Sequence, residues 1–131
     1  MSVSPSEVLP RKERIAKRRD FLRAYETGVK QFGRYSVVFA LRNDLGHPRL
    51  GVTATRKLGK AHDRNRIKRW VREIYRRHRS TLGPAAVPID FVVNIKAGAA
   101  ASTYADFSRD LVRILGKALD TARSAPDGAG S

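Results

Sequence analysis

The sequence has 131 residues, of which 27 are lysine or arginine and 12 are acidic, so its formal net charge is +15. This length fits one domain, and the absence of cysteine excludes disulfides and thiolate metal sites. No apolar run approaches the roughly 20 residues that span a bilayer, and residues 1–10 lack the apolar core of a signal peptide. We therefore expect a cytoplasmic protein with no membrane association and a polyanionic partner, because phosphates neutralised by basic side chains release counterions.

Two tails border the predicted domain. Residues 1–10 and 124–131 show no apolar periodicity, and we expect both to be flexible. No internal repeat or long linker interrupts residues 11–123. These residues are therefore predicted to form a single domain.

The first half of this domain predicts one helix and two strands. Phe21 and Tyr25 stand four residues apart and share a face of a helix over residues 18–27. Over residues 34–42 the apolar period changes to two, which is typical of a strand. A turn cluster separates this strand from a second one over residues 50–55. Because the turn is short, we expect the two strands to form an antiparallel hairpin.

The second half predicts a helix, a strand and a helix. A helix over residues 63–79 is followed by a loop over residues 83–88 and by a strand over Ile89–Ile95, whose apolar faces favour a central place in a sheet. Ser102 or Thr103 can cap a last helix, which runs to about residue 122. Its apolar face consists of Tyr104, Phe107, Leu111, Leu115 and Leu119, with Ile114 and Ala118 alongside. This alternation indicates an α/β (α+β) two-layer sandwich, in which a small sheet packs against three helices.

Residues 56–79 carry the strongest functional pattern, since they hold 11 of the 27 basic residues and two acids. At 100° per residue, one arc of the helix holds Ile67, Trp70, Val71, Ile74 and His78. The opposite arc holds Asn65, Lys68, Arg69, Arg72, Arg76 and Arg79. The helix is therefore predicted to dock through one stripe and to offer a row of cations through the other. Arginine suits this task because its planar fork grips phosphate oxygens bidentately.

Three residues of this segment have alternative interpretations. Asn65 either caps the first helical turn or contacts a sugar or phosphate. Trp70 can stack on a base, but its place on the apolar stripe favours core packing. We expect Asp63 to be the N-cap. The basic loop before the helix contains Gly59 and offers backbone amides for a phosphate, although it lacks the spacing of a nucleotide-binding P-loop.

The run Gly59-Lys60-Ala61-His62-Asp63-Arg64-Asn65-Arg66-Ile67-Lys68-Arg69, followed by Arg72, resembles the signature of the bacterial ribonuclease P protein component. The resemblance covers most of the chain and includes Leu9-Pro10, Arg14-Ile15, Arg19-Asp20-Phe21, Gly51-Val52, Arg56-Lys57 and Asp90-Phe91-Val92-Val93. A lone Arg-Asn-Arg triplet would be weak support. The ordered set at the spacings of the family is specific.

The resemblance implies a function and a fold. Proteins of this family bind a large catalytic RNA, and the two together remove the 5′ leader from precursor tRNA. The RNA supplies the active site and holds most of its Mg²⁺ ions, so the protein is an accessory subunit that is not itself catalytic. No obligate protein partner is implied. The implied element order is αβββαβα, with a mixed sheet and a left-handed βαβ crossover, an exception to the right-handed rule.

The resemblance also assigns roles to individual residues. The signature face that meets the catalytic RNA corresponds to Arg64, Asn65, Arg66, Lys68, Arg69 and Arg72, and Arg76 continues its row. Arg56, Lys57 and Lys60 correspond to the adjacent basic loop. The cleft for the single-stranded leader corresponds to Phe21, Tyr25 and Phe39, whose rings can stack on bases. The alternative for Phe21 and Phe39 is a place in the core.

Two departures from the family pattern occur. His62 and Asp63 stand where the family often has an apolar and a variable residue, so the entry to the helix can differ. Residues 31–36 blur the basic and aromatic pattern of the leader cleft.

Two rival functions remain open from the residues alone. A protein-only nuclease needs clustered carboxylates around shared metal ions, and the acids here are scattered. A ribosomal or general RNA-binding module without a role in tRNA processing shares the charge and the fold class but need not carry the ordered signature.

Overall fold

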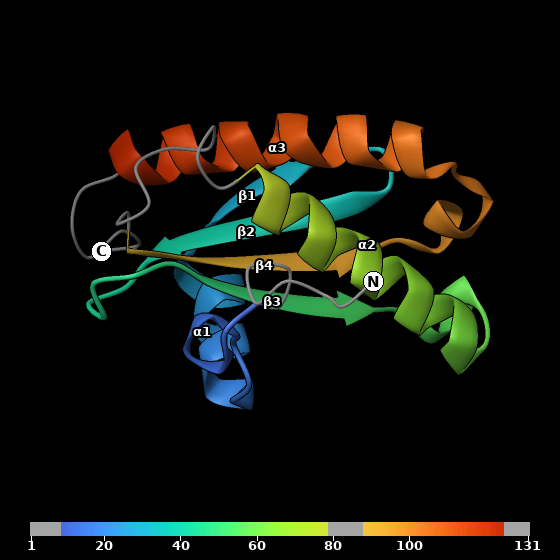
Figure 1. Ribbon diagram of the computed structural model, residues 1–131. Helices are drawn as coiled ribbons and strands as arrows, with labels where there is room; N and C mark the ends of the chain where they lie inside the picture. Colours follow the sequence, from blue (N-terminus) through green and yellow to red (C-terminus); the bar gives the residue numbers. More distant parts are fainter. Residues whose placement is uncertain (1–8, 79–87, 125–131) are drawn as a thin grey trace.

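The chain, in a computed structural model that describes residues 9–78 and 88–124, folds into one mixed sheet and three helices (Figure 1). The elements are α1 (Arg18–Thr27), β1 (Val29–Phe32), β2 (Ser36–Arg42), β3 (Arg49–Ala54), α2 (Ala61–Arg77), β4 (Ile89–Ile95) and α3 (Tyr104–Ser124), with 3₁₀ turns η2 (Arg11–Glu13), η3 (Arg56–Leu58) and η4 (Ala97–Ala101). The expected α+β class and the αβββαβα order are confirmed. The expected loop up to residue 87, the tails over residues 1–8 and 125–131, and Arg79 lie outside the described residues.

The strand order in the sheet is β1-β2-β4-β3. Strand β4 pairs antiparallel with β2 and parallel with β3, so the predicted hairpin between the second and third strands is wrong. The six residues between β2 and β3 are long enough to cross the width of one strand, and β4, apolar on both faces, takes the central place between them. The hairpin partner of β2 is β1, which was missed because it has only four residues and alternates half-buried with exposed positions.

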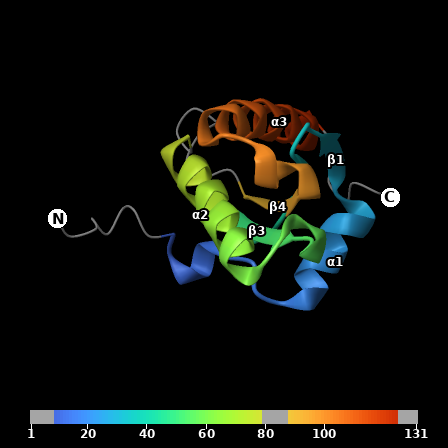
Figure 2. The ribbon, with the colours of Figure 1, turned by 90° about the vertical axis from the view of Figure 1, so that its right-hand side faces the viewer.

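The helices lie on both faces of the sheet (Figures 1 and 2). Helices α2 and α3 cover one face and enclose the larger core, which includes Ile67, Ile74, Phe107 and Leu115. Helix α1 covers the other face over a smaller cluster that includes Phe39 and Val92. Helix α1 thus adds a layer to the two that were expected, because β2 and β4 are apolar on both sides and the second side also has to be covered.

The connection from β3 through α2 to β4 is left-handed. The two strands are parallel neighbours, so the chain must return along the sheet between them. In Figure 1 the arrows of β3 and β4 both point to the right, so in Figure 2 both strands point at the viewer. Seen from there, the path from β3 through α2 to β4 turns clockwise, which is the left-handed sense. The crossover implied by the resemblance is confirmed.

Several predicted boundaries agree with the structure. Helix α1 and strand β4 have the expected limits. The Thr103 hydroxyl accepts from the Asp106 amide at 3.1 Å, as a helix cap does, and α3 buries the expected stripe. Leu9, placed in a tail by the sequence, is only 4% exposed and belongs to the larger core. Within the described residues, no helix combines the length and apolar character needed to cross a membrane.

A buried ion pair fixes the start of β3. Both oxygens of Asp90 on β4 accept from the Arg49 guanidinium, at 2.9 Å from Nε and 2.6 Å from Nη2. The Asn43 amide also donates to Asp90 at 2.7 Å, and Arg49 Nη1 lies 3.4 Å from Asp20 of α1. The hydrogen bond and the charge of Asp90 raise the pKa of Arg49 against the opposing effect of burial. This cluster joins α1, β3, β4 and the β2–β3 loop.

Candidate nucleic-acid interface

The basic loop before α2 is held by local backbone contacts. The Thr55 hydroxyl accepts from the Lys57 amide at 3.3 Å, and Leu58 is buried as the anchor of η3. Gly59 has a φ of +145°, a conformation that side chains rarely adopt, so a glycine is needed there. The anchored loop leaves three predicted site residues exposed, namely Arg56, Lys57 and Lys60.

Helix α2 docks through an apolar stripe, as predicted. Ile67, Val71 and Ile74 are fully buried, and Tyr75, which the helical wheel left off the stripe, is also buried and stacks edge-on against Phe91. Trp70 is half-buried, with its ring 5.5 Å from that of Tyr104 and 5.7 Å from that of Phe107. The core-packing interpretation of Trp70 is therefore confirmed.

The start of α2 differs from the prediction. The helix begins at Ala61, its N-cap is Lys60, and no side chain bonds to the cap, so Asp63 is not the N-cap. Asp63 lies in the first turn, where its charge favours the positive end of the helix, and its carboxylate is 3.9 Å from Arg66. Asn65 lies in the second turn and is exposed, which excludes its capping role. Its alternative as a contact for RNA stays a prediction.

The predicted cations of α2 lie opposite the stripe and along its borders. Asn65, Arg69 and Arg72 are exposed, and Arg64, Arg66, Lys68 and Arg76 are half-buried. The Arg64 guanidinium donates to the Gly59 carbonyl at 2.8 Å, and the Arg66 guanidinium lies 5.1 Å from the centre of the Trp70 ring. The helix and the loop thus form one continuous cationic surface, which we call the signature face.

Arg72 lies where positive charges crowd. Although most of its side chain is exposed, the loss of some water around the Arg72 guanidinium lowers its pKa below its ordinary value, and the charges of Arg14 and Arg69 lower it further. No acid enters this balance. An anion bound there would relieve the repulsion among the three guanidinium groups.

A hollow of about 370 Å³ lies beside α1, on the opposite face of the sheet, and we call it the aromatic hollow. Its lining residues are Ala16, Arg18, Phe21, Leu22, Tyr25 and Thr53. The Phe21 ring lies over Gly51, where a Cβ would stand 2.7 Å from Cε1 of the ring. The Tyr25 hydroxyl donates to Asn94 Oδ1 at 3.0 Å, which fixes the orientation of that ring.

Phe39 does not line this hollow. It is 7% exposed and packs edge-on beneath Tyr25, with the ring centres 4.8 Å apart. The Lys30 ammonium also lies over the Phe39 ring, 5.4 Å from the ring centre. The core alternative is therefore correct for Phe39, whereas Phe21 and Tyr25 are half-buried and line the hollow.

The acids of α2 do not converge. Asp63 lies against Arg66, and Glu73 lies 2.8 Å from Arg77. In the part of the chain that the structure describes, no group of three or more His, Cys, Asp or Glu residues is arranged to hold a metal ion. These side chains do not fit the carboxylate cluster that a two-metal nuclease requires.

The family model described as Ribonuclease P matches residues 9–119 of the chain. The chain belongs to the bacterial ribonuclease P protein family. The ribonuclease P protein component of Syntrophus aciditrophicus is 38% identical over 109 residues, which cover 83% of this chain and 89% of that protein. That of Syntrophomonas wolfei is 32% identical over 118 residues, 90% of this chain and 97% of that protein. The expected role of a ribonuclease P protein subunit in the maturation of the tRNA 5′ end is thereby confirmed.

Solved ribonuclease P proteins share the fold. The Staphylococcus aureus protein superposes with a TM-score of 0.74 at 34% identity, covering 81% of this chain and 94% of that one. The Thermotoga maritima protein gives a TM-score of 0.70 at 34% identity, covering 80% of this chain and 96% of that one. The whole described domain is therefore a ribonuclease P protein fold.

The sequence prediction overlooked one cationic segment of this ribonuclease P protein. Residues 11–23 hold seven basic residues in a stretch of 13, which is as dense as the signature. The density of basic residues is the sequence signal for this segment. It does not predict a surface by itself, because these residues follow no single helical face and only the folded chain brings them together around η2 and α1.

Proposed function

We propose that this subunit binds the catalytic RNA of ribonuclease P through the signature face and the 5′ leader of precursor tRNA through the aromatic hollow. The observation that carries the proposal is the placement of two chemically different surfaces at one edge of the sheet. Strand β3 is the edge strand, its residue Thr53 lines the aromatic hollow, and η3 follows directly after it. An RNA on one surface and a leader on the other would meet at the end of β3.

The signature face suits a folded RNA. Its arginines stand on a rigid helix whose buried side fixes their spacing, and each guanidinium can grip a phosphate bidentately. Such contacts position the protein without reading the base sequence. The crowded charge around Arg72 supports this assignment, because bound phosphate removes a repulsion that is present in the free protein.

The aromatic hollow suits a single strand. Phe21 and Tyr25 offer ring faces on which unpaired bases can stack, and Arg18 stands at the rim to meet a phosphate. Stacking is tolerant of sequence, as a binding site for varied leaders must be. A mature tRNA has no leader and would leave this hollow empty, so the hollow favours the precursor over the product.

The chemistry of cleavage belongs, in this proposal, to the RNA and to the Mg²⁺ ions that it holds. The paired and separated acids of α2 support this division, since they offer no shared metal site. The protein contributes affinity for the precursor tRNA and holds it in position on the catalytic RNA. Since bacterial tRNA precursors are transcribed in the cytoplasm, we place the protein there.

Reconstitution tests the proposal. Precursor tRNA and catalytic RNA at low Mg²⁺ are mixed with and without the protein, and we expect faster release of the leader when the protein is present. Protein without RNA should release none. An unchanged rate would contradict the proposed role, and cleavage by the protein alone would revive the protein-only nuclease.

A further inference from the structure

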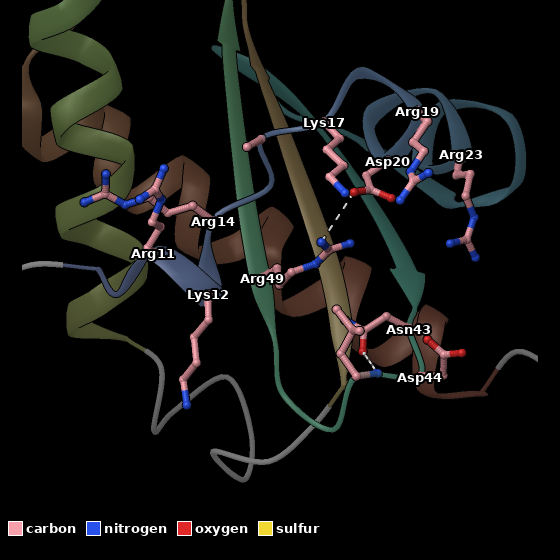
Figure 3. A pocket seen from close by; sticks show the side chains of 12 residues that line it. Arg11, Lys12, Arg14, Lys17, Arg19, Asp20, Arg23, Asn43, Asp44 and Arg49 are labelled. Carbon is pink, nitrogen blue, oxygen red and sulfur yellow. Dashed lines mark hydrogen bonds and ion pairs between the residues drawn. The ribbon is translucent and has the colours of Figure 1, made fainter.

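A second basic surface lies outside the signature face and the aromatic hollow. Turn η2, the start of α1 and the β2–β3 loop surround a recess of about 500 Å³ (Figure 3). Seven of its twelve lining residues are cations, namely Arg11, Lys12, Arg14, Lys17, Arg19, Arg23 and Arg49. Its acids are Asp20 and Asp44. We call this the basic recess.

Most of this positive charge has no acidic partner. Arg49 forms the floor and is paired with Asp90 and Asp20, and this cluster of one cation and two carboxylates keeps one net negative charge. For the other six cations, no ion pair with an acid occurs within the described residues. Figure 3 shows Arg11, Lys12 and Arg14 on one side of Arg49, and Lys17, Arg19 and Arg23 on the other. Six cations thus line one cavity together with two acids, Asp20 and Asp44, so the recess keeps a clear excess of positive charge.

The lining decides which kind of ligand fits. An excess of cations over acids favours phosphates, and bound phosphates would relieve the repulsion among the cations. None of the twelve lining residues is aromatic, so bases entering the recess would find no ring to stack on. The aromatic hollow, which shares only Ala16 with the recess, has such rings in Phe21 and Tyr25. The recess therefore fits the backbone of a folded RNA and not an unpaired leader.

The position of the recess indicates which RNA it meets. Arg14 belongs to the recess, and its charge acts on Arg72 of the signature face. The two surfaces are therefore adjacent, and positive charge runs from α2 across η2 to α1. A single large RNA can cover both.

We propose that the basic recess is a second contact for the catalytic RNA, in which backbone phosphates enter between η2 and α1. The inference rests on the proposed function, because that function supplies the RNA. It extends the interface from α2, on one face of the sheet, to α1 on the other face. The RNA is thus gripped around the β3 edge, which restrains rotation of the protein about α2.

The test replaces Arg19 and Arg23 together by glutamine. Both are exposed on α1 and remote from the core, so the fold should persist, which a thermal melt checks. Binding to the catalytic RNA is measured over a range of salt concentrations. We expect the slope of log K against log salt to become shallower by roughly 1 to 2, since each lost phosphate contact removes about 0.9. The control replaces Arg109 and Lys117 of α3 by glutamine. This makes the same change in net charge on the face of the sheet opposite α1 and outside the signature face, and it should leave the slope unchanged.

Three results would overturn the inference in distinguishable ways. An unchanged slope in the Arg19→Gln, Arg23→Gln protein, alongside a shallower slope for Arg72→Gln, refutes the basic recess and leaves the proposed function intact. Unchanged slopes for both proteins refute RNA binding at either surface and the proposed function with it. A lost preference for precursor over mature tRNA, with the RNA affinity unchanged, assigns the recess to the leader instead.

Discussion

Replacing Arg72 by glutamine should weaken RNA binding and slightly stabilise the free protein. Arg72 is exposed in the middle of α2, three residues after Arg69, and its neighbours Arg14 and Arg69 lower its pKa. Removing one of these like charges should raise the free energy of unfolding by about 0.2–0.5 kcal/mol, the usual cost of a like-charge pair on a helix. Opposite signs for binding and stability distinguish a binding residue from a structural one.

The loss of binding can be estimated from one phosphate contact. Each contact adds about 0.9 to the slope of log K against log salt, so a four-fold rise in salt weakens it by about 3.5-fold, or roughly 0.7 kcal/mol. Between 50 and 200 mM salt, the original protein should therefore lose about 3.5-fold more affinity for the catalytic RNA than the Arg72→Gln protein, a difference that follows from the counterions released at that single contact. Equilibrium titration with labelled RNA at four salt concentrations measures this difference.

A matched control and a melt complete the experiment. Lys117→Gln removes one charge from α3, outside the signature face, and should keep the original slope. If the Arg72→Gln protein keeps that slope too, Arg72 does not meet a phosphate and our reasoning about α2 is refuted. A clear fall in its melting temperature would show instead that Arg72 supports the fold.

Two further predictions follow from the other contacts. Phe21→Ala should weaken the binding of precursor tRNA to the reconstituted enzyme by roughly 1–3 kcal/mol, the contribution of one stacked base. The affinity for mature tRNA should stay unchanged. Equal losses of affinity for both would give Phe21 only a packing role. Asp90→Ala should lower the free energy of unfolding by about 3 kcal/mol in a denaturant titration, because it leaves the Arg49 guanidinium partly buried without its main partner. The surface control Asp120→Ala should change it by less than about 0.5 kcal/mol, and a similar small effect for Asp90 would show that the buried pair contributes little.

The sequence alone determined the features that depend on neighbouring residues. Helix α1, strand β4 and the buried stripe of α3 follow from apolar periods within one segment, and the structure agrees with each. The two faces of α2 follow in the same way, because the helical repeat separates Ile67 and Ile74 from Arg69 and Arg72 whatever surrounds them. The ordered signature also identified the family.

Only the tertiary structure decided what depends on distant segments meeting. The sequence paired β2 with β3, but β4 lies between them, because strand pairing is chosen by the burial of both faces of β4 across the whole sheet. Phe39 is covered by Tyr25 and Lys30, which no period within its own strand reveals. The tertiary structure also changed the cationic surface. The sequence shows only which charges are close along the chain, whereas binding requires charges that are close in space. The fold brings η2 and α1 together around Arg49.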